Sequence, residues 1–173
     1  RYNYEYQFTD NKFYGTPFEE NEMVSLEGVG DYMKTITRYE PRPYQIEGVH
    51  DALRFNRKLL ISPTASGKSM MIYSIVRYMV DKGQDVLLVV PTTSLVEQMF
   101  KDFEDYGWDA EKYCHKIYSG KEKYDNRQVT ITTWQSIYKL EKKFFSRYGC
   151  VIGDEAHLFK SKSLVSIMTK LCD

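Results

Sequence analysis

The stretch "LLISPTASGKS", residues 59–69, decides how the chain folds. Its apolar start is typical of a short buried strand, and the proline and small residues after it are typical of a tight turn. Residues 67–82 follow with apolar side chains at positions 71, 72, 75, 76, 79 and 80, which is the spacing of a helix that buries one broad face. A strand, a small-residue loop and a helix in this order predict a phosphate-binding loop.

The loop matches three of the four fixed positions of the GxxxxGK[ST] pattern, with Ser62 in place of the first glycine. Gly67 lets backbone N–H groups approach phosphate oxygens, and the start of the helix adds partial positive charge. We expect Lys68 to neutralise the terminal phosphates of ATP and Ser69 to ligate Mg²⁺. The loop residues expected around the phosphates are Pro63, Thr64, Ala65 and Ser66. The alternative is a chance turn with a surface lysine, which the strand and helix on either side make less attractive.

A second acidic element is needed to hold the metal ion and to activate a water molecule. The stretch "CVIGDEAH", residues 150–157, supplies adjacent carboxylates at the end of an apolar strand. We expect Asp154 to hold Mg²⁺ through water, and Glu155 to orient and deprotonate the attacking water. An isolated acidic pair would be read as a solvated turn, but the phosphate-binding loop upstream favours a catalytic pair.

Helices and strands alternate from residue 41 onward, which predicts an α/β fold with a central parallel sheet flanked by helices. Ligands of such sheets bind at the carboxyl ends of the strands. The expected strands are residues 58–62, 85–90, 128–133 and 150–154. The expected helices are residues 43–56, 67–82, 134–140 and 163–171, and one that opens with Ser94 and Glu97 at capping-box spacing and ends near Gly107. Residues 1–8 alternate like a strand, and residues 26–36 carry a weak helical stripe.

The formal net charge is zero, but charge is distributed unevenly along the chain. Residues 1–40 carry four Lys or Arg against eight Asp or Glu, whereas residues 112–147 carry nine against three. This basic stretch can attract phosphates, although solvated surfaces explain most lysine runs. The spacing of Cys114, Cys150 and Cys172 resembles neither a zinc site nor a disulfide framework, so we expect a reducing, intracellular setting.

No apolar run is long enough to cross a bilayer, and the first residues do not resemble a secretion signal. We therefore expect no membrane partner and a cytoplasmic protein. Because the chain starts at Arg1 and stops directly after a helical pattern, we also expect a fragment of something longer.

Five short motifs together resemble those of superfamily 2 helicases. "SPTASGKS", "VVPTTSLVEQM", "VTITTWQSI" and "GDEAH" resemble motifs I, Ia, Ic and II, and "RPYQ" resembles the upstream glutamine motif. The resemblance covers residues 39–173 and implies the first RecA-like lobe, truncated after motif II. Residues 1–38 then correspond to the remnant of an amino-terminal accessory domain. Within the superfamily, the sequences of these motifs are most similar to those of the UvsW-type bacteriophage helicases, with the XPB and RecG groups as the nearest alternatives.

The resemblance extends the expected nucleotide site. Gln45 matches the glutamine that reads the adenine edge, and Arg42 is placed to support the nucleotide pocket. His157 matches the residue that couples the nucleotide site to the next motif, although a satisfied structural histidine is an equal alternative. ATP and Mg²⁺ are the cofactors that the resemblance implies.

The resemblance also implies a track for nucleic acid along motifs Ia and Ic. Hydroxyls and backbone N–H groups at helix starts suit phosphates and carry no sequence information, so binding is expected to be independent of sequence. DNA is the expected partner, with RNA as an alternative. Trp134 either stacks on a base or is buried as an anchor. The residues carried over are Pro91, Thr92, Thr93, Gln98, Thr132, Thr133, Trp134 and Gln135.

A helicase of this type is expected to remodel branched DNA, R-loops and recombination intermediates, in the host cell cytoplasm if phage-encoded. The sequence contains no motif III and no second RecA-like lobe, which in this superfamily supplies an arginine finger worth about 10³–10⁵ in rate. The isolated chain is therefore expected to bind ATP weakly and to be nearly inactive. Two alternatives from other classes are a P-loop small-molecule kinase and a non-enzymatic DNA-binding module.

Overall fold

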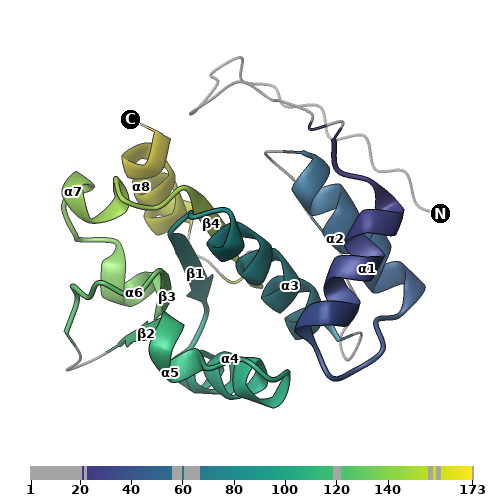
Figure 1. The fold of residues 1–173 in the computed structure, drawn as a ribbon. Helices are drawn as coiled ribbons and strands as arrows, with labels where there is room; N and C mark the ends of the chain where they lie inside the picture. Colours follow the sequence, from purple (N-terminus) through teal and green to yellow (C-terminus); the bar gives the residue numbers. More distant parts are fainter. Residues whose placement is uncertain are drawn as a thin grey trace.

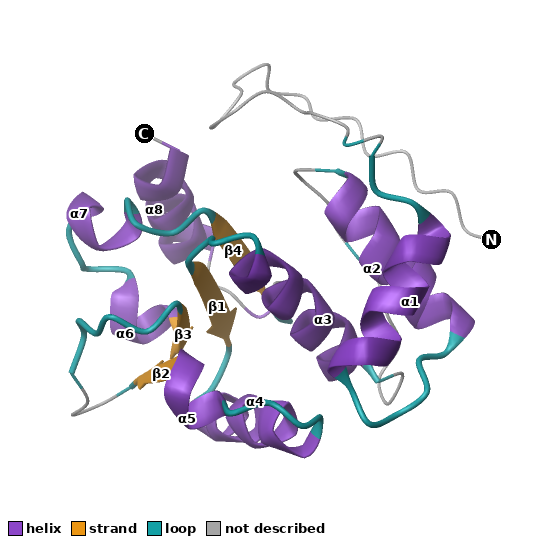
Figure 2. Ribbon diagram, viewed as in Figure 1, coloured by secondary structure: helices purple, strands orange, loops and turns teal. Residues whose placement is uncertain are grey.

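A computed structural model describes residues 21, 23–55, 60, 67–118, 122–155, 158 and 161–172. These residues form an α/β structure in which helices lie on both sides of a small sheet (Figures 1 and 2). The helices are α1 (Leu26–Ile36), α2 (Pro43–Arg54), α3 (Lys68–Asp81), α4 (Thr93–Asp105), α5 (Ala110–Tyr113), α6 (Trp134–Ile137), α7 (Lys142–Phe145) and α8 (Ser161–Cys172). The strands are β1 (Val86–Val90), β2 (Cys114–Ile117), β3 (Val129–Thr133) and β4 (Cys150–Gly153).

The described strands form one parallel sheet in the order β2-β3-β1-β4. Val86, the first residue of β1, is level with Val129 of β3 and Cys150 of β4, so these strands begin at one edge of the sheet and end at the other. All five residues of β1 are buried. A central parallel strand is covered on both faces, which is why its sequence is a continuous apolar run. The predicted α/β fold with a parallel sheet is confirmed.

The two faces of the sheet are covered by different helices. Leu88 of β1 belongs to a core cluster that includes side chains of α3 and α4, such as Tyr73 and Phe103. Its neighbour Leu87 belongs to a second cluster, which packs against Trp134 of α6, the phenylalanines of α7 and Ile167 of α8. Successive side chains of a strand point to opposite faces, so β1 supplies both cores.

Helices α1 and α2 extend the side of the molecule that carries α3. Val29 and Met33 of α1 share an apolar cluster with Leu53 of α2 and Ile75 of α3. The Tyr32 hydroxyl also donates to Asp81 at the end of α3, over 2.6 Å. The stripe predicted over residues 26–36 is confirmed as helix α1. The expected strand at residues 1–8 lies outside the described residues, and the boundary at residue 38 stays a prediction.

Several sequence expectations need correction. Helix α4 is capped by Thr92, whose hydroxyl accepts from the backbone N–H of Leu95, and not by Ser94. The carboxylate of Glu97 bonds Lys116 and Tyr118 instead of closing a capping box. Helix α6 is shorter than predicted, and β2, α5 and α7 were not predicted.

The strand expected at residues 58–62 is described at Leu60 alone, so that prediction is not tested. No helix within the described ranges is long and apolar enough to cross a membrane.

Candidate nucleotide-binding site

The carboxyl-terminal edge of the sheet gathers the predicted functional residues. Strand β4 ends at Gly153, directly before Asp154, and β1 and β3 end at Val90 and Thr133. The backbone N–H of Asp154 donates to the carbonyl of Val89 over 2.8 Å, so Asp154 is held at the last rung of the sheet. This is the edge at which parallel sheets bind ligands.

Lys68, the first residue of α3, reaches the acidic pair that follows β4. Its Nζ lies 2.8 Å from Oδ1 of Asp154 and also donates to Oε1 of Glu155. Asp154 is 7% exposed and Glu155 is 29% exposed, so a largely buried carboxylate and a partly open one share one ammonium group. The predicted meeting of the helix start and the acidic pair, 87 residues apart in sequence, is confirmed.

The Lys68 ammonium stays charged in this cluster. Partial burial acts to lower the pKa of Lys68, but hydrogen bonds and charge attraction from Asp154 and Glu155 outweigh it, so the pKa lies above its ordinary range. Among the described residues, one ammonium group thus contacts two carboxylates, whose oxygens are ligands that suit an incoming cation.

Glu155 adopts a left-handed backbone conformation with φ of 50°. Such a conformation is uncommon for residues other than glycine, and it concentrates at functional sites. Asp154 and Glu155 lie in a bend directly after β4, and both carboxylates contact Lys68. The strained backbone of Glu155 therefore occurs at the residue that pairs with Lys68.

Gly67 lies directly before α3 with φ of 74°, also in the left-handed region. Its carbonyl accepts a hydrogen bond from Nε2 of Gln45 over 3.2 Å, and a Cβ atom at this position would collide with that nitrogen. Oε1 of Gln45 accepts from the backbone N–H of Arg42 over 2.8 Å. Gln45 is buried, and its amide links the start of α2 to the start of α3.

The hydroxyl of Ser69 lies 2.5 Å from the hydroxyl of Tyr106, the residue that ends α4. The ring of Tyr106 packs against Tyr73 and Tyr39, with centroids 5.0 and 6.0 Å away. Burial raises the pKa of Tyr106 despite the opposing contribution of Ser69, so the phenol stays neutral at physiological pH. Sequence reasoning missed Tyr106, because no motif marks an aromatic residue at a helix end.

The donors at this edge fit Mg²⁺ in its usual protein setting. Magnesium takes oxygen ligands and is typically held by one or two carboxylates together with the phosphates of a nucleotide. The Ser69 hydroxyl and the Asp154 carboxylate are such donors, and both lie beside Lys68. In the part of the chain that the structure describes, no group of three or more His, Cys, Asp or Glu is arranged to hold a metal by itself.

The residues expected to contact nucleic acid separate into an exposed and a buried set. Thr92, Thr93 and Gln98 lie exposed at the start of α4, whereas Thr132 and Thr133 are buried at the end of β3. Nε2 of Gln135 lies 3.5 Å from the carbonyl of Pro91, which joins the two expected motifs. Trp134 is 9% exposed and packs beside Tyr138, which agrees with the anchoring alternative rather than base stacking.

Some expected residues are not brought into the nucleotide site, or cannot be placed. The Arg42 side chain is exposed and contacts the hydroxyl of Tyr44 over 3.4 Å, whereas the backbone N–H and carbonyl of Arg42 bond Gln45. Outside the described residues lie Pro63, Thr64, Ala65, Ser66 and His157.

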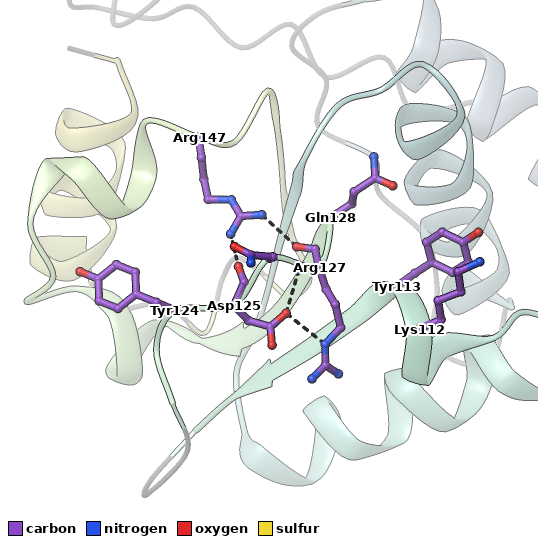
Figure 3. A pocket seen from close by; sticks show the side chains of 8 residues that line it. Lys112, Tyr113, Tyr124, Asp125, Arg127, Gln128 and Arg147 are labelled. Carbon is purple, nitrogen blue, oxygen red and sulfur yellow. Dashed lines mark hydrogen bonds and ion pairs between the residues drawn. The ribbon is translucent and has the colours of Figure 1, made fainter.

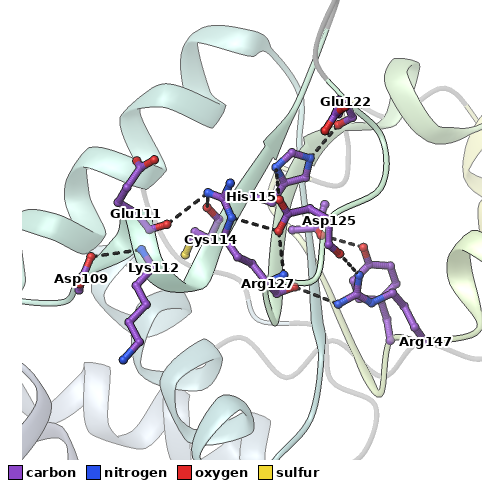
Figure 4. A network of polar contacts seen from close by, with 11 residues as sticks. Asp109, Glu111, Lys112, Cys114, His115, Glu122, Asp125, Arg127 and Arg147 are labelled. Atoms are coloured by element: carbon purple, nitrogen blue, oxygen red, sulfur yellow. Dashed lines mark hydrogen bonds and ion pairs between the residues drawn. The ribbon is translucent and has the colours of Figure 1, made fainter.

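A separate hollow of about 690 Å³ lies where the strands begin, at the amino-terminal edge of the sheet (Figure 3). Its two arginines are engaged in a network within the protein (Figure 4). Arg147 bonds the carboxylate of Asp85 and the carbonyls of Asp125 and Arg127, and Arg127 bonds Asp125 and the carbonyls of Glu111 and Cys114. These two arginines of the basic stretch therefore stabilise the loops at this edge.

A parallel sheet whose carboxyl-terminal edge brings a P-loop helix to an acidic turn is typical of P-loop nucleotide-binding folds, a class that includes the RecA-like helicase lobes. Residues 38–172 match the family described as type III restriction enzyme, res subunit, and the chain belongs to this family. The predicted resemblance to superfamily 2 helicases, and to the UvsW type among them, is confirmed.

The chain is also similar to individual helicases and translocases. The chain is 37% identical over 139 residues to the ATP-dependent DNA helicase uvsW of Enterobacteria phage T4, across 78% of this chain and 28% of the relative. It is 29% identical over 134 residues to the DNA 3'-5' translocase XPB2 of Sulfurisphaera tokodaii, again across 78% of this chain and 28% of the relative. The chain thus spans much less than the full length of these proteins.

Solved structures give the same fold. The crystal structure of the UvsW helicase from bacteriophage T4 matches 89% of this chain and 58% of that chain, with a TM-score of 0.81 and 32% identity. The Sulfolobus solfataricus SWI2/SNF2 ATPase core in complex with dsDNA matches 79% of this chain and 36% of that chain, with a TM-score of 0.52 and 16% identity. The second similarity supports the fold alone.

Proposed function

We propose that this chain is the ATP-binding first lobe of an ATP-dependent DNA helicase or translocase. The observation that carries the proposal is the contact of Lys68 with both Asp154 and Glu155, because it brings the phosphate-binding and acidic motifs into one site. The family membership adds nucleotide use, since the relatives are named as ATP-dependent helicases and a translocase.

In the proposed site, each residue has a distinct task. Lys68 exchanges its carboxylate partners for the terminal phosphates of ATP, and Gln45 presents its amide to the adenine edge. Asp154 and Ser69 hold Mg²⁺, which when bound neutralises charge on the phosphates. Glu155 accepts the proton of the attacking water, a role for which its partly exposed carboxylate is suited.

The nucleic-acid track in this proposal runs along the start of α4. The exposed hydroxyls of Thr92 and Thr93 and the side chain of Gln98 contact the sugar-phosphate backbone, so binding is independent of base sequence. The buried Thr132, Thr133 and Trp134 support this surface from β3 and α6. DNA is the proposed partner, with RNA as a second possibility.

The remaining proposals concern the whole protein. Residues 39–173 form the first RecA-like lobe, and residues 1–38 belong to an accessory domain that precedes it. A second RecA-like lobe of the same parent chain closes over the nucleotide and supplies an arginine finger. The enzyme acts on branched DNA, R-loops and recombination intermediates in the cytoplasm of the host cell.

The test uses a full-length protein that contains this chain. We expect ATP hydrolysis to be stimulated by forked DNA and R-loops, and Glu155→Gln to abolish hydrolysis while ATP still binds. Transfer of phosphate to a small molecule without nucleic-acid stimulation would instead identify a kinase. DNA binding together with no ATP affinity would identify a binding module, and either result would refute the proposal.

A further inference from the structure

The hydrogen bond between Ser69 and Tyr106 joins the start of α3 to the end of α4, two helices with separate tasks in the proposed function. Ser69 stands at the start of α3, where the phosphates of ATP are expected, and Tyr106 ends α4. The opposite end of α4 carries Thr92 and Thr93, which are expected to contact nucleic acid. A single helix therefore separates the expected nucleic-acid contact from the serine hydroxyl.

Helix α4 is one continuous, packed helix between these two ends. It is 13 residues long, or about 20 Å at 1.5 Å per residue. Val96, Met99, Phe100 and Phe103 are buried along one face, and the Thr92 cap satisfies a backbone N–H at its start. The backbone N–H of Tyr106 donates to the carbonyl of Asp102 over 2.9 Å, so the tyrosine continues the helical hydrogen bonding.

The phenol of Tyr106 is held in place independently of Ser69. Its ring lies 5.0 Å from the ring of Tyr73, which is itself fully buried and bonded to the carbonyl of Ile36 over 2.5 Å. The ring of Tyr39 meets Tyr106 edge to face. The hydroxyl of Tyr106 therefore offers Ser69 a fixed partner rather than a freely rotating one.

A serine hydroxyl has one proton and two lone pairs. If Ser69 donates its proton to Tyr106, its side-chain rotamer is fixed and its lone pairs stay available to a cation. Groups that orient a metal ligand in this way typically change metal affinity about 10- to 100-fold when they are removed.

We propose that Tyr106 is a positioning residue for the metal ligand Ser69, and that it transmits the position of α4 to the nucleotide site. This inference rests on the proposed function, because it takes Ser69 to be a ligand of the Mg²⁺ that accompanies ATP. It assigns the phenol of Tyr106 a role in coupling nucleic-acid binding to metal-dependent nucleotide binding.

The test measures equilibrium binding of a hydrolysis-resistant ATP analogue to the full-length protein as Mg²⁺ is titrated. Tyr106→Phe removes the hydroxyl and keeps the packed ring. We expect the Mg²⁺ concentration for half-maximal binding to rise about tenfold, with Mg²⁺-free binding unchanged. In a Ser69→Ala background, Tyr106→Phe should have no further effect, because Tyr106 acts through Ser69. Tyr32→Phe is the matched control, since its hydroxyl bonds Asp81 at the far end of α3.

The second arm adds a saturating single-stranded oligonucleotide. We expect it to shift the Mg²⁺ midpoint in the unsubstituted protein and to leave the midpoint of Tyr106→Phe unchanged. Equal shifts in both proteins, no shift in either, or an unaltered midpoint in Tyr106→Phe without oligonucleotide would each overturn the inference. Failure of the proposed function is distinguishable, because then Lys68→Ala also would leave analogue binding intact.

Discussion

Cations and carboxylates meet at both edges of the sheet, but in different ways. At the amino-terminal edge, Arg147 bonds Asp85 and two backbone carbonyls, and Arg127 bonds Asp125 and two further carbonyls. At the carboxyl-terminal edge, Lys68 contacts both Asp154 and Glu155, and Glu155 has a left-handed backbone. The first edge distributes its hydrogen bonds over loops that begin three strands, whereas the second concentrates negative charge around one ammonium group.

This difference indicates that a high local density of charged residues does not by itself mark a ligand-binding site. The basic stretch of residues 112–147 has the larger excess of positive charge, and the hollow of about 690 Å³ lies beside it. Yet its arginines are occupied by groups of the protein, so they stabilise the fold. An excess of carboxylates over cations, held on strained backbone at the ligand-binding edge, is the better indicator of function.

Replacing one lysine at each edge should give the largest difference between the edges, measured as a change in ATP affinity. Lys68→Ala deletes the cation that faces the phosphates, and charge-assisted hydrogen bonds are worth about 1.5–3 kcal/mol, so ATP affinity should fall about 10- to 100-fold. Lys112→Ala removes an exposed lysine at the amino-terminal edge and should leave affinity unchanged. Titration with a fluorescent ATP analogue checks both, and equal affinities in the two variants would contradict the assignment of the site.

Removing an arginine should produce the opposite pattern. Arg147→Ala breaks three hydrogen bonds, so the free energy of unfolding should fall by about 1–3 kcal/mol while ATP affinity is kept. Lys143→Ala, in the same basic stretch, should change stability by less than about 0.5 kcal/mol. Denaturant unfolding provides the measurement, and a loss of ATP affinity in Arg147→Ala would show that the edges are not independent.

Two glycines with left-handed backbones allow a finer comparison. Gly67→Ala and Gly83→Ala should each lose about 1–2 kcal/mol of stability, because both positions have positive φ. At Gly83 a Cβ atom would meet nothing, whereas at Gly67 it would displace the Gln45 amide. We therefore expect weaker ATP binding in Gly67→Ala alone, and the prediction fails if Gly83→Ala weakens binding as much.

Acid pH and alkaline pH should each lower the free energy of unfolding slightly, through groups at different edges of the sheet. Burial acts to raise the pKa of Asp125, but hydrogen bonds and charge from Arg127 outweigh it, so the pKa is lowered. The stability from Asp125 is therefore present above its ordinary pKa of about 3.9 and is lost as the pH falls through the lower folded value. The raised pKa of Lys68 has the opposite sign, so its contribution is present below about pH 10.4 and is lost as the pH rises through the folded value.

The measurement compares the unfolding free energy of the unsubstituted protein with that of Asp125→Asn at acid pH and with that of Lys68→Met at alkaline pH. The difference from Asp125→Asn should shrink as the pH falls, and the difference from Lys68→Met should shrink as the pH rises. Neither difference should exceed about 1 kcal/mol because water screens these partly exposed groups. A difference that grows toward the extreme would contradict the assigned sign.

The sequence predicted the central part of the sheet because buried parallel strands are continuous apolar runs. Residues 86–90 form such a run, whereas residues 128–133 were recognised by their β-branched Val, Ile and Thr side chains, and both became strands. Strand β2 has the sequence "CHKI", and it was missed because its polar residues are satisfied by distant groups. His115 bonds the carbonyl of Glu122, and Lys116 bonds Glu97. Only tertiary structure brings these partners together.

The candidate site was predictable where its chemistry lies within one local motif. Lys68 and Asp154 could each be identified from a few neighbouring residues, and the parallel-sheet rule predicted that they would meet. Tyr106 could not be identified, because its contact with Ser69 spans 37 residues and depends on how α4 crosses α3. The cap of α4 was placed two residues late because Ser is a better capping type than Thr, and Ser94 also has Glu97 at capping-box spacing.

The side-chain amide of Gln45 has a consequence for how a nucleotide base could bind. The amide donates one N–H to Gly67 and accepts one hydrogen bond from Arg42, so it ties the start of α2 to the start of α3. A glutamine amide has a second N–H and a second lone pair, so a purine could pair with this side chain while both contacts persist. A base bound there would then be held by the same side chain that joins the two helices.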